Sequence, residues 1–101
     1  MILDINEDAD RELNDAADYY DSESRGLGTL FLDQVELGYQ RILENPNAAE
    51  EIDTGIRRLV LATFPFNLIY EIDGDVILIL AIAHQRRRPH YWHERRTGCA
   101  D

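Results

Sequence analysis

The segment from Val76 to Ala83 constrains the fold of this chain most, because all eight of its residues are apolar. An alternating pattern would indicate a strand with one face in water, whereas a short continuous apolar run indicates a strand buried on both faces. We therefore predict that residues 76–84 form the buried central strand of a sheet. Three consecutive arginines, Arg86–Arg88, come directly after it, so the strand should deliver positive charge to a sheet edge.

The first half of the chain has helical patterns. Asn6 is a suitable N-cap, and acidic residues follow it in the first turn, where the helix dipole favours negative charge. Apolar residues then recur at helical spacing, which predicts a helix over residues 7–21 with a stripe of small side chains. Phe31, Val35, Tyr39 and Ile42 mark a second helix that ends near residues 45–46.

Strand patterns surround these helices. Residues 2–5 predict a short first strand, and residues 45–55 a polar loop. Residues 56–62 and 66–73 predict two further strands, and Asp73-Gly74-Asp75 indicates a hairpin turn into the apolar strand. The predicted fold is a single α+β domain over residues 1–101, in which an N-terminal strand and an antiparallel helical hairpin pack on a twisted, mostly antiparallel sheet. The order is β-α-α-β-β-β, with a short helix or irregular tail at the end.

Composition restricts the class of protein. No run approaches the roughly 18 apolar residues of a membrane span, and the start of the chain lacks the pattern of a signal peptide. The single cysteine, Cys99, has no partner for an internal disulfide. We therefore expect a cytoplasmic protein without membrane contact.

Charge is distributed unevenly along the chain, whose formal net charge is -10. Residues 1–53 hold fifteen acidic side chains and three arginines, whereas residues 54–101 hold five acidic side chains and seven arginines; there is no lysine. Genome composition or adaptation to salt is one explanation of the acidity. The other is a bipolar molecule whose basic half docks on a partner, while the acidic half disfavours unassisted binding to nucleic acid.

The arginine cluster is the main candidate site. In an extended segment Arg86 and Arg88 share one face, and Arg57 and Arg58 on the first strand of the meander lie near them if the sheet brings the two segments together. Guanidinium groups bind phosphate or carboxylate in bidentate fashion and stabilise a developing oxyanion. The alternative is that these arginines, with Arg87, neutralise the chain's own carboxylates.

Histidines and aromatic residues flank the cluster. His84 is a candidate general base or a hydrogen-bonded cap of the core, and the core cap is the favoured interpretation. His90 and His93 have helical spacing for a metal, but without a third ligand we predict no metal site and no cofactor. Tyr91 and Trp92 either stack on a base or anchor the tail on the sheet, and we favour anchoring.

The ordered set of motifs resembles a known family. The set comprises Asn6-Glu7-Asp8-Ala9, Ala17-Asp18-Tyr19-Tyr20, Gly26-Leu27-Gly28, Glu44-Asn45-Pro46, Arg57-Arg58-Leu59, Phe64-Pro65-Phe66 and the closing segment His84 to Trp92. Over residues 2–95 the chain resembles the RelE/ParE superfamily of toxins from type II toxin–antitoxin modules, in the branch called plasmid stabilisation proteins. The resemblance implies a two-helix, antiparallel-sheet fold, growth inhibition, and a cognate antitoxin that binds and neutralises the protein in a hetero-oligomer.

The resemblance does not decide between two kinds of target. RelE-like members cleave messenger RNA on the ribosome, with basic side chains that stabilise the phosphorane, whereas ParE-like members bind and poison DNA gyrase. The ribonuclease branch carries an arginine in a segment that corresponds to residues 66–70, and this chain has Asn67 at that position. Arg86 does match a basic position of the family.

The sequence therefore predicts a ParE-like toxin that inhibits gyrase by binding and is not an enzyme. Its binding residues would be Arg57, Arg58, Arg86, Arg87, Arg88, Tyr91 and Trp92. The enzymatic alternative is a metal-independent ribosome-dependent endoribonuclease with candidate catalytic residues Arg58, His84, Arg86, Arg88 and Tyr91. The second alternative is a non-toxic family member that only binds its antitoxin.

Overall fold

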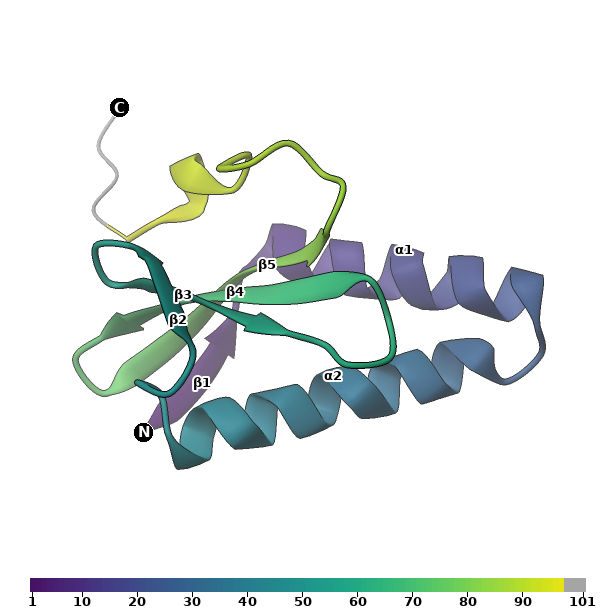
Figure 1. Cartoon of the computed structure of the whole chain (residues 1–101), viewed down its shortest axis with the longest axis horizontal. Helices are drawn as coiled ribbons and strands as arrows, with labels where there is room; N and C mark the ends of the chain where they lie inside the picture. The colour runs from purple at the N-terminus through teal and green to yellow at the C-terminus, as the bar shows by residue number, and fades with distance from the viewer. Residues whose placement is uncertain (98–101) are drawn as a thin grey trace.

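The computed structural model describes residues 1–97 and has two helices and five strands in the order β1-α1-α2-β2-β3-β4-β5, followed by a short 3-10 helix, η1 (Figure 1). Cys99 lies outside the described residues. The strands form one mixed sheet in the spatial order β1-β5-β4-β3-β2, in which β1 is parallel to β5 and the other pairs are antiparallel. This confirms the predicted α+β class. Within residues 1–97 no helix has both the length and the apolar content that a membrane span requires.

Helix α1 (Glu7–Glu23) begins as predicted and is two residues longer than expected. The Asn6 side chain accepts a hydrogen bond from Asp8 N at 2.8 Å, so it satisfies one free donor of the first turn. The helix ends at Ser24, whose N–H donates to Tyr20 O at 3.0 Å.

Helix α2 (Leu27–Glu44) packs closely against α1 because Gly28 lies where the two helices meet. A Cβ atom at Gly28 would overlap Ala17 O and lie 2.7 Å from Asp21 Cγ. The N-cap, Gly26, has φ 86° and no side chain to offer, and instead Asp21 Oδ1 accepts a hydrogen bond from Gly28 N at 2.7 Å. The carboxylate therefore caps the neighbouring helix.

The strands β3 (Ile56–Val60), β4 (Phe66–Asp73) and β5 (Val76–His84) form the predicted meander. Gly74, with φ 59°, supplies the left-handed residue of the hairpin between β4 and β5. Strand β5 is buried and interior as predicted, but β4 occupies the middle of the sheet. β1 (Ile2–Ile5) extends along only the first half of β5.

Strand β2 (Glu50–Asp53) was not predicted, since residues 45–55 were expected to be a loop. Its sequence, Glu-Glu-Ile-Asp, has low β-propensity, and it pairs with β3 only as an irregular edge strand with a register shift between Glu51 and Asp53. Tertiary pairing with β3 therefore determines its conformation. Charged side chains are suited to such an edge because they disfavour pairing with another chain.

Strand β5 is apolar without alternation because both of its faces are covered, and a β-bulge within it changes which residues face which side. Ile69 lies opposite Ala81 and Tyr70 opposite Ile79, so Leu80 is one additional residue in β5. As a result Ile79 packs in the core under the helices, whereas Leu80 and Ala81 both pack on the opposite face of the sheet.

The core has two parts, one on each face of the sheet. The larger part holds helix residues such as Phe31, Val35 and Ile42 together with Leu68 and Ile77 of the sheet. The smaller part lies on the face opposite α1 and α2, which we call the helix-free face, and contains no residue of either helix. Its buried members are Ile56, Ile69, Leu80, Ala81, Ala83 and Trp92. The segment after β5 therefore covers this second face, as Figure 1 shows for the yellow end of the chain.

Candidate functional site

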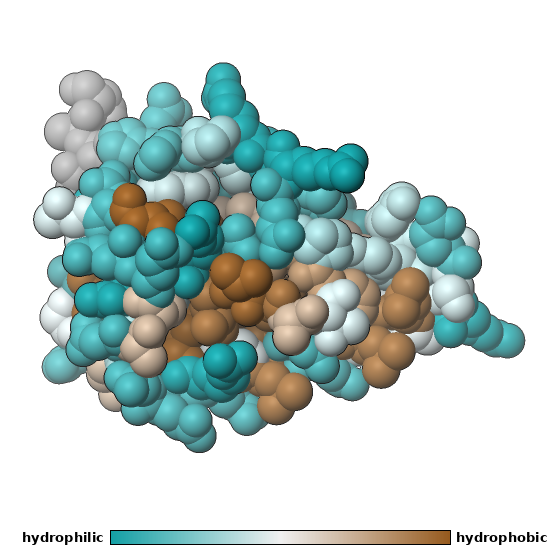
Figure 2. All heavy atoms as spheres, in the orientation of Figure 1, coloured by the Kyte–Doolittle hydropathy of each residue, from teal (hydrophilic) through white to brown (hydrophobic). Residues whose placement is uncertain are grey.

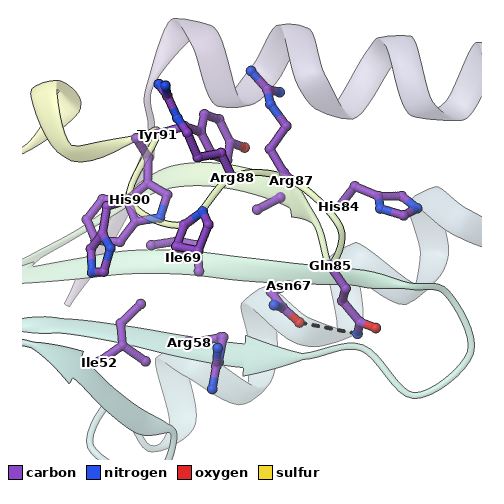
Figure 3. A pocket seen from close by; sticks show the side chains of 13 residues that line it. Ile52, Arg58, Asn67, Ile69, His84, Gln85, Arg87, Arg88, His90 and Tyr91 are labelled. Carbon is purple, nitrogen blue, oxygen red and sulfur yellow. Dashed lines mark hydrogen bonds between the residues drawn. The ribbon is translucent and has the colours of Figure 1, made fainter.

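The residues that follow β5 form one wall of a pocket on the helix-free face of the sheet, which we call the arginine pocket (Figure 3). Its volume is about 190 Å³. Its lining residues are Ile52, Arg58, Asn67, Ile69, Ala83, His84, Gln85, Arg87, Arg88, Pro89, His90, Tyr91 and Trp92. Six of the eight predicted candidates are thus brought together: Arg58, His84, Arg87, Arg88, Tyr91 and Trp92.

The chain turns sharply directly after β5. His84 Nδ1 accepts a hydrogen bond from Arg86 N at 3.0 Å, and Arg87 N donates to His84 O at 2.9 Å. The expectation that Arg86 and Arg88 share a face does not hold, since it assumed an extended backbone. Arg88 lines the arginine pocket and Arg86 does not.

Arg57 and Arg58 are separated by the alternation of β3. Arg58 lies on the helix-free face, forms an ion pair with Glu50 of β2, and lines the arginine pocket. Arg57 donates from Nη1 to Ala49 O at 2.7 Å and to Asn47 O at 3.1 Å, so it secures the loop before β2. The expectation that Arg57 joins the arginine cluster is therefore wrong.

Arg87 extends toward α1 (Figure 3). Its Nη1 lies 3.7 Å from Glu12 Oε2, and its guanidinium carbon lies 3.9 Å from the centroid of the Tyr91 ring. Both contacts stabilise a cation, the second through the face of the aromatic ring. Arg58 and Arg87 thus follow the alternative in which the arginines pair with the chain's own carboxylates. Within residues 1–97, Arg86 and Arg88 form no ion pair.

Two amide side chains and a histidine complete the mouth of the pocket. Gln85 Nε2 donates to Asn67 Oδ1 at 3.4 Å, across the ends of β4 and β5 (Figure 3). The His84 ring packs edge-on against Phe66, with the ring centroids 5.1 Å apart. His84 therefore caps the core, as favoured from the sequence, while it also borders the pocket.

Trp92 anchors the end of the chain, as predicted. Its side chain is only 3% exposed and packs against Ile69 and Leu80 on the helix-free face. Burial of an indole contributes on the order of 4 kcal/mol as an upper value. Burial, together with the nearby Glu12 carboxylate, raises the pKa of the neighbouring Tyr91 well above its usual range, so this phenol keeps its proton to more alkaline pH than an exposed tyrosine.

Two further arginines, not among the predicted candidates, fix this segment. Arg95, at the end of η1 (His93–Arg95), donates to Glu12 Oε1 at 3.0 Å and Oε2 at 3.2 Å. It also donates to Leu80 O, at the bulge, at 3.0 Å. Arg96 contacts Asp53 Oδ2 at 3.2 Å. No sequence signal could have found these contacts, because the partners lie 83 and 43 residues apart.

No group of three or more potential metal-ligating side chains occurs within residues 1–97. His90, one of the two histidines considered for a metal, has φ 63°, and its ring lies 5.5 Å from the Trp92 ring. The pocket as built offers guanidinium and amide donors over an apolar floor. Such an arrangement binds an anionic group that carries apolar surface.

The surface of α2 also carries exposed apolar side chains, which were not among the predicted site residues. Leu30 and Leu37 of α2 are 57% and 51% exposed, and their seven-residue spacing places them on one helix face. Figure 2 shows such hydrophobic residues at the surface along α2, surrounded by hydrophilic ones. Patches of this kind commonly mark interaction surfaces.

The fold combines an N-terminal strand, a helical hairpin and an antiparallel meander that ends in an arginine cluster. A family-model match over most of the chain places it in the RelE/ParE superfamily of small toxins. Within it, the chain belongs to the family described as ParE toxin of type II toxin–antitoxin system, parDE, whose model matches residues 3–89.

No curated protein matches the chain. A comparison with solved structures supports the fold alone. Among solved structures the chain is similar to a chain described as chromosomal ParDE TA system from P. aeruginosa, with a TM-score of 0.73 and 22% sequence identity. The match covers 83% of this chain and 95% of that chain.

Proposed function

We propose that this chain is a toxin that acts by binding DNA gyrase in the cytoplasm, and that a cognate antitoxin neutralises it in a hetero-oligomeric complex. The observation that carries the proposal is the ParE family match over residues 3–89, combined with Asn67 at the position where the ribonuclease branch has an arginine. A neutral amide at that place supports recognition and disfavours phosphoryl transfer.

The state of the pocket arginines also supports binding. A ribonuclease needs preorganised charge at the phosphorane and a positioned acid and base. Arg87 approaches the part-buried Glu12 and Arg58 pairs with the exposed Glu50, so a carboxylate offsets the charge of each guanidinium, the second only weakly. Asn67 is engaged with Gln85. Arg86 and Arg88, which form no ion pair with the residues that the structure describes, are suited to electrostatic docking on a protein surface.

The antitoxin would cover the remaining apolar surface. The exposed leucines of α2, Leu30 and Leu37, suit a groove-binding or helical partner segment. The arginine edge at residues 86–88 suits acidic residues of the same partner. In our proposal the antitoxin therefore binds both the helical hairpin and the sheet edge.

The ribonuclease alternative is retained because Arg58, His84, Arg88 and Tyr91 line one pocket. It predicts that Arg88→Ala abolishes cleavage of messenger RNA while the protein stays folded. It makes the same prediction for Arg86→Ala, although Arg86 lies outside the pocket lining.

The decisive experiment is pulse-labelling of DNA and protein synthesis in a bacterial host just after this chain alone is induced. We expect an early fall in DNA synthesis while translation continues, and inhibition of supercoiling by purified gyrase. The double variant Arg86→Ala/Arg88→Ala should lose this effect, and Arg25→Ala, an exposed arginine between the helices, should keep it.

Other outcomes point to the alternatives. Early arrest of translation with intact DNA synthesis would establish the ribonuclease instead. If neither synthesis falls, although the protein is folded and present, the chain is a non-toxic antitoxin-binding member in that host. Supercoiling that is unchanged by excess purified protein would refute gyrase as the target.

A further inference from the structure

We propose that the arginine pocket is a docking site for one acidic residue of a partner protein together with the apolar side chain next to it. The inference rests on the proposed function in one respect, namely that the partner is a protein. It goes beyond that function because it specifies the chemistry of the partner segment that the pocket binds: an acidic residue next to an apolar one.

The size of the pocket limits its occupant. At about 190 Å³ it is smaller than the roughly 300–1,000 Å³ of pockets that hold cofactors or drug-sized ligands. The space suits one side chain that enters from solvent. A peptide segment can place such a side chain in the pocket while its backbone runs over the mouth and a neighbouring carboxylate lies at the rim.

Cationic groups at the rim select a carboxylate. Arg88 is exposed and has no ion pair within residues 1–97, so its guanidinium is available to a partner. Arg58 also lines the pocket, and its guanidinium pairs with Glu50. Because the Glu50 side chain is 64% exposed, that pair is weak, and a partner's carboxylate can take its place.

The interior of the pocket selects apolar surface. Ile69 and Trp92 are each 3% exposed, and they form the floor together with Ala83. The amides of Asn67 and Gln85, joined by a long hydrogen bond of 3.4 Å, lie at the mouth. Each amide has further donors and acceptors, which can bind the backbone of the partner segment.

The surroundings of the pocket favour a protein over a nucleic acid. Glu12 borders the rim through Arg87 on the α1 side, and Glu50 borders it through Arg58 on the β2 side. A chain of phosphates that leaves the pocket in either direction meets these carboxylates, and the molecule carries a net charge of -10. A single acidic residue avoids this repulsion, whereas a polyanion does not.

The test is an NMR titration of the ¹⁵N-labelled full chain with two synthetic peptides, acetyl-Ser-Glu-Phe-Glu-Ser-amide and its counterpart with glutamine in place of glutamate. We expect the acidic peptide to shift the side-chain amide signals of Asn67 and Gln85 in a saturable way. The glutamine peptide should bind about tenfold more weakly, since the charge-assisted hydrogen bonds are lost.

Matched variants locate the site. Arg88→Ala should weaken binding of the acidic peptide about fivefold or more, and Arg58→Ala should weaken it independently. Arg25→Ala removes the same charge far from the pocket and should leave binding unchanged. The backbone spectrum of each variant verifies that it is folded.

Several results would overturn the proposal: equal binding of the two peptides, no saturable shift at the pocket signals, or tighter binding of a short oligouridylate than of the acidic peptide at those signals. The titration is independent of the gyrase assay. Peptide binding without any effect on gyrase would keep the pocket assignment and reject only the proposed target.

Discussion

At the scale of single residues, Glu12 joins three parts of the molecule. It lies on α1, yet its Oε1 accepts hydrogen bonds from Ile82 N of β5 at 3.1 Å and from Arg95 of the C-terminal segment at 3.0 Å. The side chains of Glu12 and Arg95 are 17% and 16% exposed, so water replaces little of this contact. Arg87 borders the same carboxylate, which therefore helps to position the pocket rim.

We expect Glu12→Ala to lower the free energy of unfolding by about 2–3 kcal/mol, because Ile82 N loses its acceptor and Arg95 keeps only Leu80 O and a longer contact with Asp8. Glu12→Gln should cost less, since the amide oxygen still accepts a hydrogen bond from Ile82 N. Urea denaturation at neutral pH measures both. Asp18→Ala, an exposed change on the same helix, should stay within about 0.5 kcal/mol. A similarly small change for Glu12→Ala would show that the contact adds no stability.

Tyr39 makes a second prediction at this scale. Its hydroxyl is buried and has no hydrogen-bond partner within residues 1–97, so Tyr39→Phe should be neutral or stabilising at pH 7. Burial, with smaller contributions from Asp10 and Glu36, raises the pKa of Tyr39 well above 10. Above pH 10 the unfolded chain therefore loses this proton while the folded chain keeps it, and stability falls as the pH rises.

The wild-type protein should accordingly lose about 1–2 kcal/mol more stability than Tyr39→Phe between pH 10 and about pH 11.5. Urea denaturation at a series of alkaline pH values measures the difference. Tyr70 and Tyr91 also have raised pKa values, so the variant should keep part of the alkaline loss. If the free energies of unfolding of the two proteins fell by the same amount over this pH range, Tyr39 would not be the source of the alkaline loss of stability.

At the scale of elements, the α1–α2 contact depends on one glycine. Alanine normally stabilises a helix interior relative to glycine by about 1 kcal/mol. At Gly28, however, a Cβ atom would overlap the backbone oxygen of Ala17, and only a separation of the helices relieves the overlap. We expect Gly28→Ala to destabilise the protein by about 2–3 kcal/mol, and a thermal unfolding curve shows this as a fall in Tm of about 10 °C or more.

Gly38→Ala is the matched control. The new Cβ atom there would lie 2.6 Å from Leu68 Cδ1, the end of a flexible side chain that can rotate away. Its cost should therefore be smaller than that of Gly28→Ala. If Gly38→Ala destabilised the protein more than Gly28→Ala, the α1–α2 contact would accommodate an added methyl group more easily than the packing around Leu68 does.

The elements that could be predicted are those whose local sequence determines them. Asn6 with its acidic turn predicts the start of α1, and Asp73-Gly74-Asp75 the last hairpin. Strand β2 could not be predicted, because Glu50–Asp53 becomes a strand only through pairing with β3. The bulge at Leu80 could not be predicted either, because an all-apolar segment has no alternation of polar and apolar residues that an additional residue would interrupt.

The candidate site was partly predictable for the same reason. The segment from His84 to Trp92 shows its charge and its aromatic anchor directly in the sequence. The alternation of β3 separates Arg57 from Arg58. A local turn, in which His84 Nδ1 accepts a hydrogen bond from Arg86 N, takes Arg86 out of the pocket. Glu12 and Arg95 meet across 83 residues, and no local pattern reports such a pair.

At the scale of the whole molecule, the net charge of -10 on a body of 40 × 31 × 20 Å opposes folding through self-repulsion. The Debye length is about 30 Å at 0.01 M salt, which is comparable to these dimensions, and falls below about 10 Å above 0.1 M. Salt therefore screens repulsion between distant acidic side chains. It affects the part-buried Glu12–Arg95 pair much less, because the two side chains are 17% and 16% exposed.

We therefore expect the free energy of unfolding to rise by about 1–2 kcal/mol when NaCl increases from about 0.01 M to about 0.3 M at pH 7. Urea denaturation at each salt concentration measures this. NaCl is preferred to sulfate, which would also strengthen apolar burial. The control variant Asp15→Asn/Asp18→Asn/Glu23→Gln neutralises three exposed carboxylates, brings the net charge from -10 to -7, and should respond less to salt. If salt instead lowered the stability, attraction in the ion pairs of Arg58, Arg95 and Arg96 would outweigh the repulsion, and the acidity would not act as a general destabilising charge.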